Sequence, residues 1–114
     1  METISKFEEI PSWQKARQLT KEIYRLTTTE KFSKDLILRE RTQRAAVSIM
    51  TAFAVGFGRK TNKDYASFLV LAHGFAAEVK SCLYVALDLQ YIDQQAFDKI
   101  SEWLDQISND YGFL

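Results

Sequence analysis

Residues 41–89 read RTQRAAVSIMTAFAVGFGRKTNKDYASFLVLAHGFAAEVKSCLYVALDL, two apolar-rich segments separated by a short turn with glycines. Within each segment, apolar residues recur at steps of three and four, as on one face of an α-helix. We expect one helix from Ser33 or Lys34 to about Val55, and a second that Thr61 or Asn62 caps and that fades after Leu89. The expected core stripes are Leu38, Thr42, Ala45, Ala46, Ile49 and Phe53 in the first helix, and Tyr65, Phe68, Leu69, Ala72, Ala76, Val79, Leu83 and Ala86 in the second.

The turn between these helices is predicted at residues 56–60. Gly56 and Gly58 match the glycines that commonly end α-helices. Asp64 would lie in the first turn of the next helix, where a carboxylate favours the positive end of the helix dipole. A phosphate-binding glycine loop follows a β-strand, whereas this loop follows a helix. We therefore interpret the glycines as a helix stop and a turn.

Two amphipathic segments flank the central pair. Ser12, which follows Pro11, is predicted to cap a first helix that ends in the β-branched run 27–29. Asp93 is predicted to cap the last helix. The stripes are Trp13, Ala16, Leu19 or Thr20, Ile23 and Leu26 in the first helix, and Phe97, Ile100, Leu104, Ile107 and Tyr111 in the last. Because short connections place sequential helices antiparallel, the sequence predicts an all-α, antiparallel up-and-down four-helix bundle.

The composition suits one globular domain. Of the 114 residues, 46% are hydrophobic and 26% are charged. We assign the bundle to residues 11–114 and predict a mobile N-terminal arm at residues 1–10. The 15 basic and 15 acidic residues give a formal net charge of zero. A dedicated nucleic-acid binder is usually basic overall, so such a role would need a local patch.

The sequence predicts a cytoplasmic protein without a membrane partner. Cys82 is the single cysteine, which excludes an internal disulfide and suits a reducing compartment. Residues 1–10 lack the apolar region of a signal peptide. The longest apolar run, residues 68–79, is too short and too polar to span a bilayer.

The two central helices carry more apolar side chains than one stripe each requires. The surplus residues are Val47, Met50, Val55, Val70, Leu71, Phe75, Tyr84 and Val85. A monomer of this size would expose several of them, and large exposed apolar patches usually mark an interface. We therefore predict a homo-oligomer. The alternative is that a wide central helix pair buries most of these residues within one subunit.

Two basic clusters are the candidate nucleic-acid contacts. They comprise Arg39, Arg41 and Arg44 in the second predicted helix, and Arg59, Lys60 and Lys63 around the glycine turn. Such side chains give salt-sensitive, sequence-independent binding to phosphates. The alternative, which we favour, is a solvated face with pairs such as Glu40–Arg44 at i,i+4 spacing. Trp103 and Tyr111 could stack on bases, although such aromatics more often fill cores or interfaces.

Catalytic, metal and cofactor sites are not predicted. His73 is the single histidine, and no cysteine lies near it at the spacing of metal ligands. Di-iron bundles need Glu-x-x-His pairs on two helices, and none occurs in the sequence. Cys82 lies within the apolar second central helix, where a free cysteine behaves as a small hydrophobe. We expect a non-enzymatic protein without a cofactor.

The order and spacing of several short motifs resemble one known family. They are Trp13-Gln14-Lys15-Ala16, Ile23-Tyr24, Leu26-Thr27, Arg44-Ala45-Ala46-Val47-Ser48-Ile49, Ala54, Gly56, Gly58-Arg59, Phe68-Leu69, Ala72-His73-Gly74 and Ala77-Glu78. Together they resemble the four-helix-bundle proteins of the 23S rRNA intervening-sequence family, from about Phe7 to the C-terminus. Ala52 and Val55 stand where many members have asparagine and glutamate, and Phe75 stands where the usual residue is serine.

The resemblance implies a four-helix bundle that assembles as a ring, typically a pentamer, without an established activity. The apolar substitutions suit packing better than chemistry. We therefore expect a homo-oligomeric scaffold or adaptor whose partners are copies of itself and another protein. The alternative is weak, sequence-independent binding of RNA or DNA through repeated basic clusters.

Overall fold

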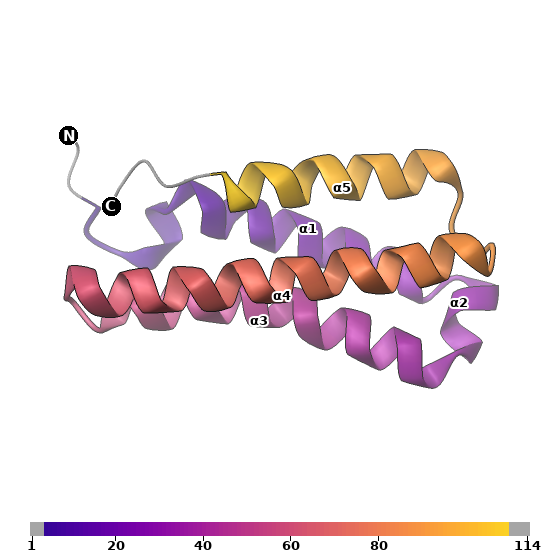
Figure 1. The fold of residues 1–114 in the computed structure, drawn as a ribbon, viewed down its shortest axis with the longest axis horizontal. Coiled ribbons are helices and arrows are strands. Elements are labelled where there is room, and N and C mark those ends of the chain that lie inside the picture. Colours follow the sequence, from indigo (N-terminus) through magenta and orange to yellow (C-terminus); the bar gives the residue numbers. More distant parts are fainter. Residues whose placement is uncertain (1–3, 110–114) are drawn as a thin grey trace.

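The computed structural model describes residues 4–109 as a bundle of four long helices that measures 44 × 23 × 18 Å (Figure 1). The elements are the 3-10 helix η1 (Phe7–Glu9) and the α-helices α1 (Pro11–Thr27), α2 (Glu30–Lys34), α3 (Leu36–Gly58), α4 (Asn62–Asp88) and α5 (Gln94–Ser108). Both α1 and α4 pack against α3 and α5. The outer α3–α4 face and the outer α1–α5 face therefore lie on opposite sides of the molecule. The predicted antiparallel four-helix bundle is confirmed.

Polar side chains cap the N-termini of three of the long helices. Asp35, Thr61 and Asp93 accept hydrogen bonds from the backbone N–H groups of Leu38, Asp64 and Ala96, at 3.1, 3.1 and 2.8 Å. These bonds satisfy amides that have no partner within their own helix. The predicted Thr61 and Asp93 caps are confirmed.

The first long helix begins differently from the prediction that Ser12 caps it. Ile10 is the N-cap, Pro11 occupies the first helical turn and Ser12 is buried just after it. Proline suits the first helical position because its missing N–H would have no intrahelical partner there. The Ser12 prediction is therefore wrong.

The predicted start of the second helix at Ser33 or Lys34 is also wrong. Residues 30–34 form the separate helix α2, and Asp35, with φ −88° and ψ 84°, lies outside helical geometry between α2 and α3. One carboxylate oxygen of Asp35 caps α3, and the other accepts from the Tyr91 hydroxyl at 3.0 Å. The aspartate thus ends one helix, starts the next and ties this corner to the α4–α5 connection.

The glycines of the predicted loop at residues 56–60 belong instead to the last turn of α3, which continues to Gly58. The turn comprises residues 59–61, with Lys60 at a positive φ of 64°. A Cβ atom at Gly56 would lie 2.6 Å from the Cβ of Phe68 and 3.3 Å from Cδ1 of Tyr65. Gly56 therefore lets α3 and α4 approach closely rather than stopping the helix.

The predicted stripes form most of the core. Every stripe residue of α3 is buried, as are the α5 stripe residues from Phe97 to Ile107. Trp13 of α1 and Phe68 of α4 are only half-buried, which corrects their assignment to the core interior. The predicted stripe residue Tyr111 lies outside the described residues. The buried hydroxyl of Thr42 donates to the Leu38 carbonyl at 2.6 Å, so this polar group stays satisfied.

Part of the predicted N-terminal arm is described. Ile10 is fully buried, and the Phe7 ring packs edge-on against Trp13 with a centroid distance of 5.2 Å. Among the described helices, α4 meets the length and apolarity criteria for a membrane span. The core helix of a bundle meets the same criteria, and α4 packs along α3 and α5.

Candidate functional site

An apolar groove runs between α3 and α4 on their outer face. Its walls are Ser48, Thr51, Ala52 and Val55 from α3, and Phe68, Leu71 and Phe75 from α4. Val55 and Leu71 are 38% and 49% exposed, whereas Phe68 and Phe75 are half-buried. The face therefore presents aromatic and aliphatic surface to whatever contacts it.

The predicted interface residues differ in their surroundings. Val55, Leu71 and Phe75 line the groove together. Met50 is half-buried against the core, and the Tyr84 ring packs on Phe97 at a centroid distance of 4.7 Å. The exposed members of the predicted set are Val47, Val55, Val70, Leu71, Tyr84 and Val85. Burial within one subunit thus accounts for few of these side chains.

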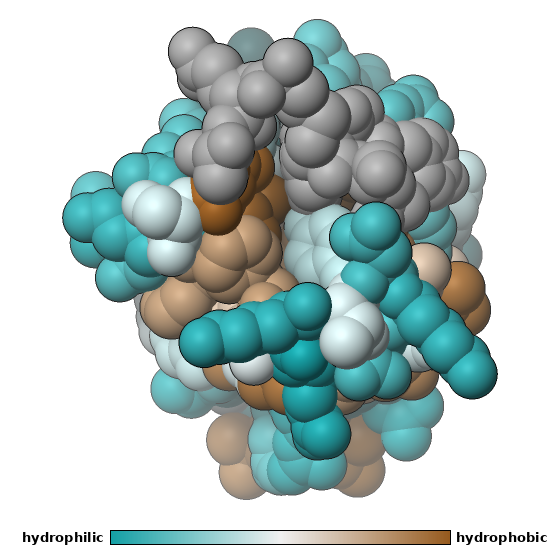
Figure 2. Space-filling view, turned by 90° about the vertical axis from the view of Figure 1, so that its left-hand side faces the viewer, coloured by the Kyte–Doolittle hydropathy of each residue, from teal (hydrophilic) through white to brown (hydrophobic). Residues whose placement is uncertain are grey.

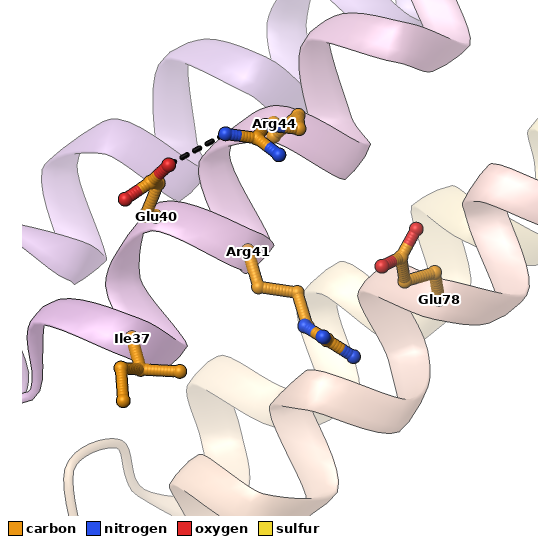
Figure 3. A pocket seen from close by; sticks show the side chains of 5 residues that line it. All are labelled: Ile37, Glu40, Arg41, Arg44 and Glu78. Carbon is orange, nitrogen blue, oxygen red and sulfur yellow. Dashed lines mark hydrogen bonds and ion pairs between the residues drawn. The ribbon is translucent and has the colours of Figure 1, made fainter.

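A charged cleft lies elsewhere between the same two helices. Figure 3 shows its walls, which are Ile37, Glu40, Arg41 and Arg44 of α3 and Glu78 of α4. Arg44 forms an ion pair with Glu40 one helical turn away. Arg41 and Glu78 form no hydrogen bond or ion pair with any residue in the range 4–109. The cleft therefore holds one cation and one carboxylate that have no partner within the described chain.

The sequence patterns did not identify several residues of this face. Phe68 was assigned to the predicted core stripe and not to the predicted interface, because its place opposite Gly56 depends on how α3 packs against α4. Ile37 is 81% exposed and Leu36 is 69% exposed, and neither was singled out. Both residues lie off the apolar stripe of α3, and this position could have identified them as exposed from the sequence.

The predicted basic residues occupy separate parts of the molecule. Arg41 and Arg44 line the cleft, whereas Arg39 is half-buried on α3 and does not line it. Arg59, Lys60 and Lys63 are exposed around the α3–α4 turn. At a rise of 1.5 Å per residue, about 22 Å of helix separates Arg44 from Arg59.

The α3–α4 turn lies at the end of the bundle that faces the viewer in Figure 2. There, long hydrophilic side chains lie beside exposed hydrophobic surface. The guanidinium of Arg59 lies 5.6 Å from the centroid of the Phe68 ring, which also lines the apolar groove. The end of the groove is thus close to the basic turn.

Cys82 and His73, the two candidate reactive side chains, both lie on α4. Cys82 is buried, and burial raises the pKa of its thiol, which disfavours the reactive thiolate. His73 is half-buried on α4. Within the described part of the chain, no cluster of three or more histidine, cysteine, aspartate or glutamate residues could hold a metal ion.

Trp103 marks the opposite, α1–α5 face. It is half-buried, and the ammonium groups of Lys15 and Lys99 lie 5.4 and 5.1 Å from its ring centroid. Lys99 also pairs with Glu22 at 3.5 Å. Trp103, which was considered for base stacking from the sequence, therefore has two cations near its ring, and Tyr111 is not among the described residues.

The described residues form a small all-α bundle with an apolar groove and a separate charged cleft between α3 and α4. Residues 8–111 match the 23S rRNA-intervening sequence protein family, and the chain belongs to this family. The family resemblance inferred from the motifs is therefore confirmed.

A solved structure shows the same fold. It is a protein with unknown function from the S23 ribosomal protein family of Bacteroides thetaiotaomicron, with a TM-score of 0.77 and 18% sequence identity. The alignment covers 85% of this chain and 91% of that one. At this identity the likeness carries the fold alone. A comparison with curated protein sequences gave no match.

Proposed function

We propose that this protein is a non-enzymatic scaffold or adaptor that assembles with copies of itself through the outer α3–α4 face. The family resemblance favours a closed ring, with a pentamer as the expected size. The observation that carries the proposal is the apolar groove, in which Val55 and Leu71 remain exposed beside Phe68 and Phe75. Covering exposed apolar area gains roughly 25 cal/mol per Å², so such a groove favours association.

The test compares two neighbouring residues of α4. Leu71 lines the groove, whereas Val70 is 72% exposed and does not line it. Leu71→Asp should shift the mass measured by light scattering towards the monomer, because a carboxylate would be buried in the contact. Val70 belongs to the surplus apolar set predicted as interface but lies outside the groove, so Val70→Asp adds the same charge and should leave the mass unchanged if the groove is the contact. Equal effects of both variants, or no effect of Leu71→Asp on an oligomer, would contradict this location.

The second candidate function is weak binding of RNA or DNA by the α3–α4 turn. Arg59, Lys60 and Lys63 are exposed, and none forms an ion pair with a described residue. A ring would repeat this cluster, and repeated weak contacts gain avidity. Fluorescence anisotropy with labelled RNA and DNA should show salt-sensitive binding. Replacing Arg59, Lys60 and Lys63 together by alanine should weaken this binding. The absence of any shift at low salt would contradict this function.

A further inference from the structure

Basic and acidic side chains are divided between α3 and α5. Helix α3 carries three arginines and one glutamate, whereas α5 carries three acidic residues and one lysine. Both helices pack against α1 and α4, which places them at diagonal corners of the bundle. Attraction between these opposite charges is therefore weak within one subunit, and it is available to a contact that brings α3 of one copy beside α5 of another.

The acidic residues of α5 form a stripe beside α4. Asp105 pairs with Lys80 of α4 at 3.8 Å, so it lies on the α4 side of its helix. Asp98 and Glu102 share that side, because they lie seven and three residues before Asp105. Both are exposed and lack an ion pair with any residue in the range 4–109, and Asp98 accepts a hydrogen bond from Gln94 at 2.8 Å. The outer α4–α5 face thus carries two carboxylates without a cation.

Arg41 is the cation of the outer α3–α4 face that is open to such carboxylates. Arg44 already pairs with Glu40, whereas Arg41 is exposed and forms no ion pair with a described residue (Figure 3). Glu78 lies across the same cleft from Arg41. A guanidinium has five N–H donors, so Arg41 can bind Glu78 and a carboxylate of another copy at the same time. Both free charges of the cleft are then satisfied.

The packing of α3 on α4 gives the level of Arg41 along the bundle. A Cβ at Gly56 would lie 2.6 Å from the Cβ of Phe68, so these residues of two antiparallel helices share a level. Arg41 lies fifteen residues before Gly56, and Tyr84 lies sixteen residues after Phe68. Arg41 and Tyr84 therefore lie at nearly the same level.

The packing of α5 on α4 gives the level of the carboxylates. The Tyr84 ring contacts the Phe97 ring, with centroids 4.7 Å apart, and Asp98 follows Phe97 directly. A rise of 1.5 Å per residue then places Arg41 within about 5 Å of Asp98 along the bundle axis. Glu102 lies about one helical turn further along.

We infer that the outer α4–α5 face of one copy docks on the outer α3–α4 face of the next, with Arg41 paired to Asp98. This inference rests on the proposed self-association. The two faces share α4 and stand at about a right angle, so each copy is turned relative to the last and the assembly closes into a small ring. Rotation about an axis parallel to the helices leaves axial levels unchanged, so Arg41 meets Asp98. Helix α4 then lies nearest the ring axis.

The same arrangement covers the apolar groove. Helix α4 of the next copy lies over Leu71, and its exposed Ala77 and Ser81 have small side chains that permit a close approach. Val70 lies nine residues, or about two and a half turns, from the fully buried Val79. It therefore points away from the core and towards the ring axis, outside the contact.

Charge reversal on one or both sides tests the pairing. Arg41→Glu and Asp98→Arg should each raise the dissociation constant of the oligomer by at least about tenfold, because like charges then face each other. Sedimentation velocity over a dilution series measures this constant. The chain that carries both changes should recover to within about threefold of the wild-type value. Arg41 and Asp98 lie on different outer faces of one subunit, so recovery reflects a contact between copies.

Lys21 supplies the matched control. It is exposed on α1, which is the helix farthest from the ring axis, and it has no ion pair with a described residue. Lys21→Glu should leave the dissociation constant unchanged. Combined with Asp98→Arg, it should not restore association, although this chain has the same net charge as the rescued one. Circular dichroism shows whether each variant folds. If a reversal unfolds the chain, Arg41→Gln and Asp98→Asn remove only the charge and should still weaken association.

The possible failures are distinguishable. A wild-type monomer would remove the proposed self-association and this inference with it. An oligomer that tolerates both single reversals, or that the double reversal fails to restore, would overturn the Arg41–Asp98 pairing and leave the proposed function standing. The mass of a closed ring reaches a plateau as the protein concentration rises, so a mass that keeps growing would overturn docking through adjacent faces.

Discussion

Replacing Gly56 by alanine probes how closely α3 and α4 pack. The new Cβ would lie 2.6 Å from the Cβ of Phe68, which is fixed to the α4 backbone and cannot rotate away. Overpacking of this kind costs about 1–3 kcal/mol. Alanine recovers about 0.5–1 kcal/mol because it loses less backbone entropy than glycine on folding. We expect a net loss of about 1–2 kcal/mol in the free energy of unfolding.

Gly74 supplies the control for this substitution. It lies exposed within α4, and a Cβ there would meet no atom within 4 Å. Gly74→Ala should therefore gain about 0.5–1 kcal/mol. Urea unfolding followed by circular dichroism measures both variants, at one protein concentration because association adds to apparent stability. The packing argument fails if Gly56→Ala unfolds at the wild-type urea concentration or above, or if Gly74→Ala loses as much stability.

Further predictions concern a cap, a thiol and an ion pair. Asp93→Ala should lower the free energy of unfolding by about 1 kcal/mol in urea titrations, since the bond to the Ala96 N–H is lost; an unchanged midpoint would refute the cap's contribution. Cys82 should react with a thiol reagent at pH 8 far more slowly in the folded than in the unfolded protein, because burial raises its pKa; equal rates would contradict its burial. The hydrogen bond from Arg25 lowers the pKa of Glu22, so the pair stabilises the fold above the unfolded glutamate pKa of about 4.3 and loses this effect as the pH falls through the native value. Arg25→Gln should therefore be less stable than wild type at pH 7 and equal to it at pH 2, and a difference that persists at pH 2 would rule this out.

Local pattern was enough to predict the bundle. The α3 stripe from Leu38 to Phe53 follows helical spacing, and all its members are buried. Thr61 and Asp93 cap their helices as their side chains and positions suggested. These features depend on residues within a few positions of one another, so the chain order alone reveals them.

Features that depend on distant residues were not predictable in the same way. Gly56 has the sequence signature of a helix stop, yet it lies within α3, and a side chain at this position would clash with Phe68 on the neighbouring helix. Asp35 shows both cases, because its cap on Leu38 is local and has the same signature as the Asp93 cap, whereas its bond with Tyr91 joins positions 56 residues apart.

The candidate site shows the same limit. The sequence identified Val55, Leu71 and Phe75 as surplus apolar residues, but not that Phe68 lies with them in one groove. It also grouped Arg39 with Arg41 and Arg44, although only the latter two line the cleft. The rotation of α3 and α4 about their axes decides these placements, and spacing along one helix leaves that rotation open.

The mass of the wild-type protein in solution tests the central claim most directly. Light scattering on a size-exclusion column should be run at micromolar concentration in low and high salt. Assembly through the apolar groove predicts a stable oligomer at both salt concentrations, with a pentamer as the expected size, because salt screens ion pairs but does not weaken apolar contacts. A monomer of 13.2 kDa under both conditions would contradict assembly through the α3–α4 face.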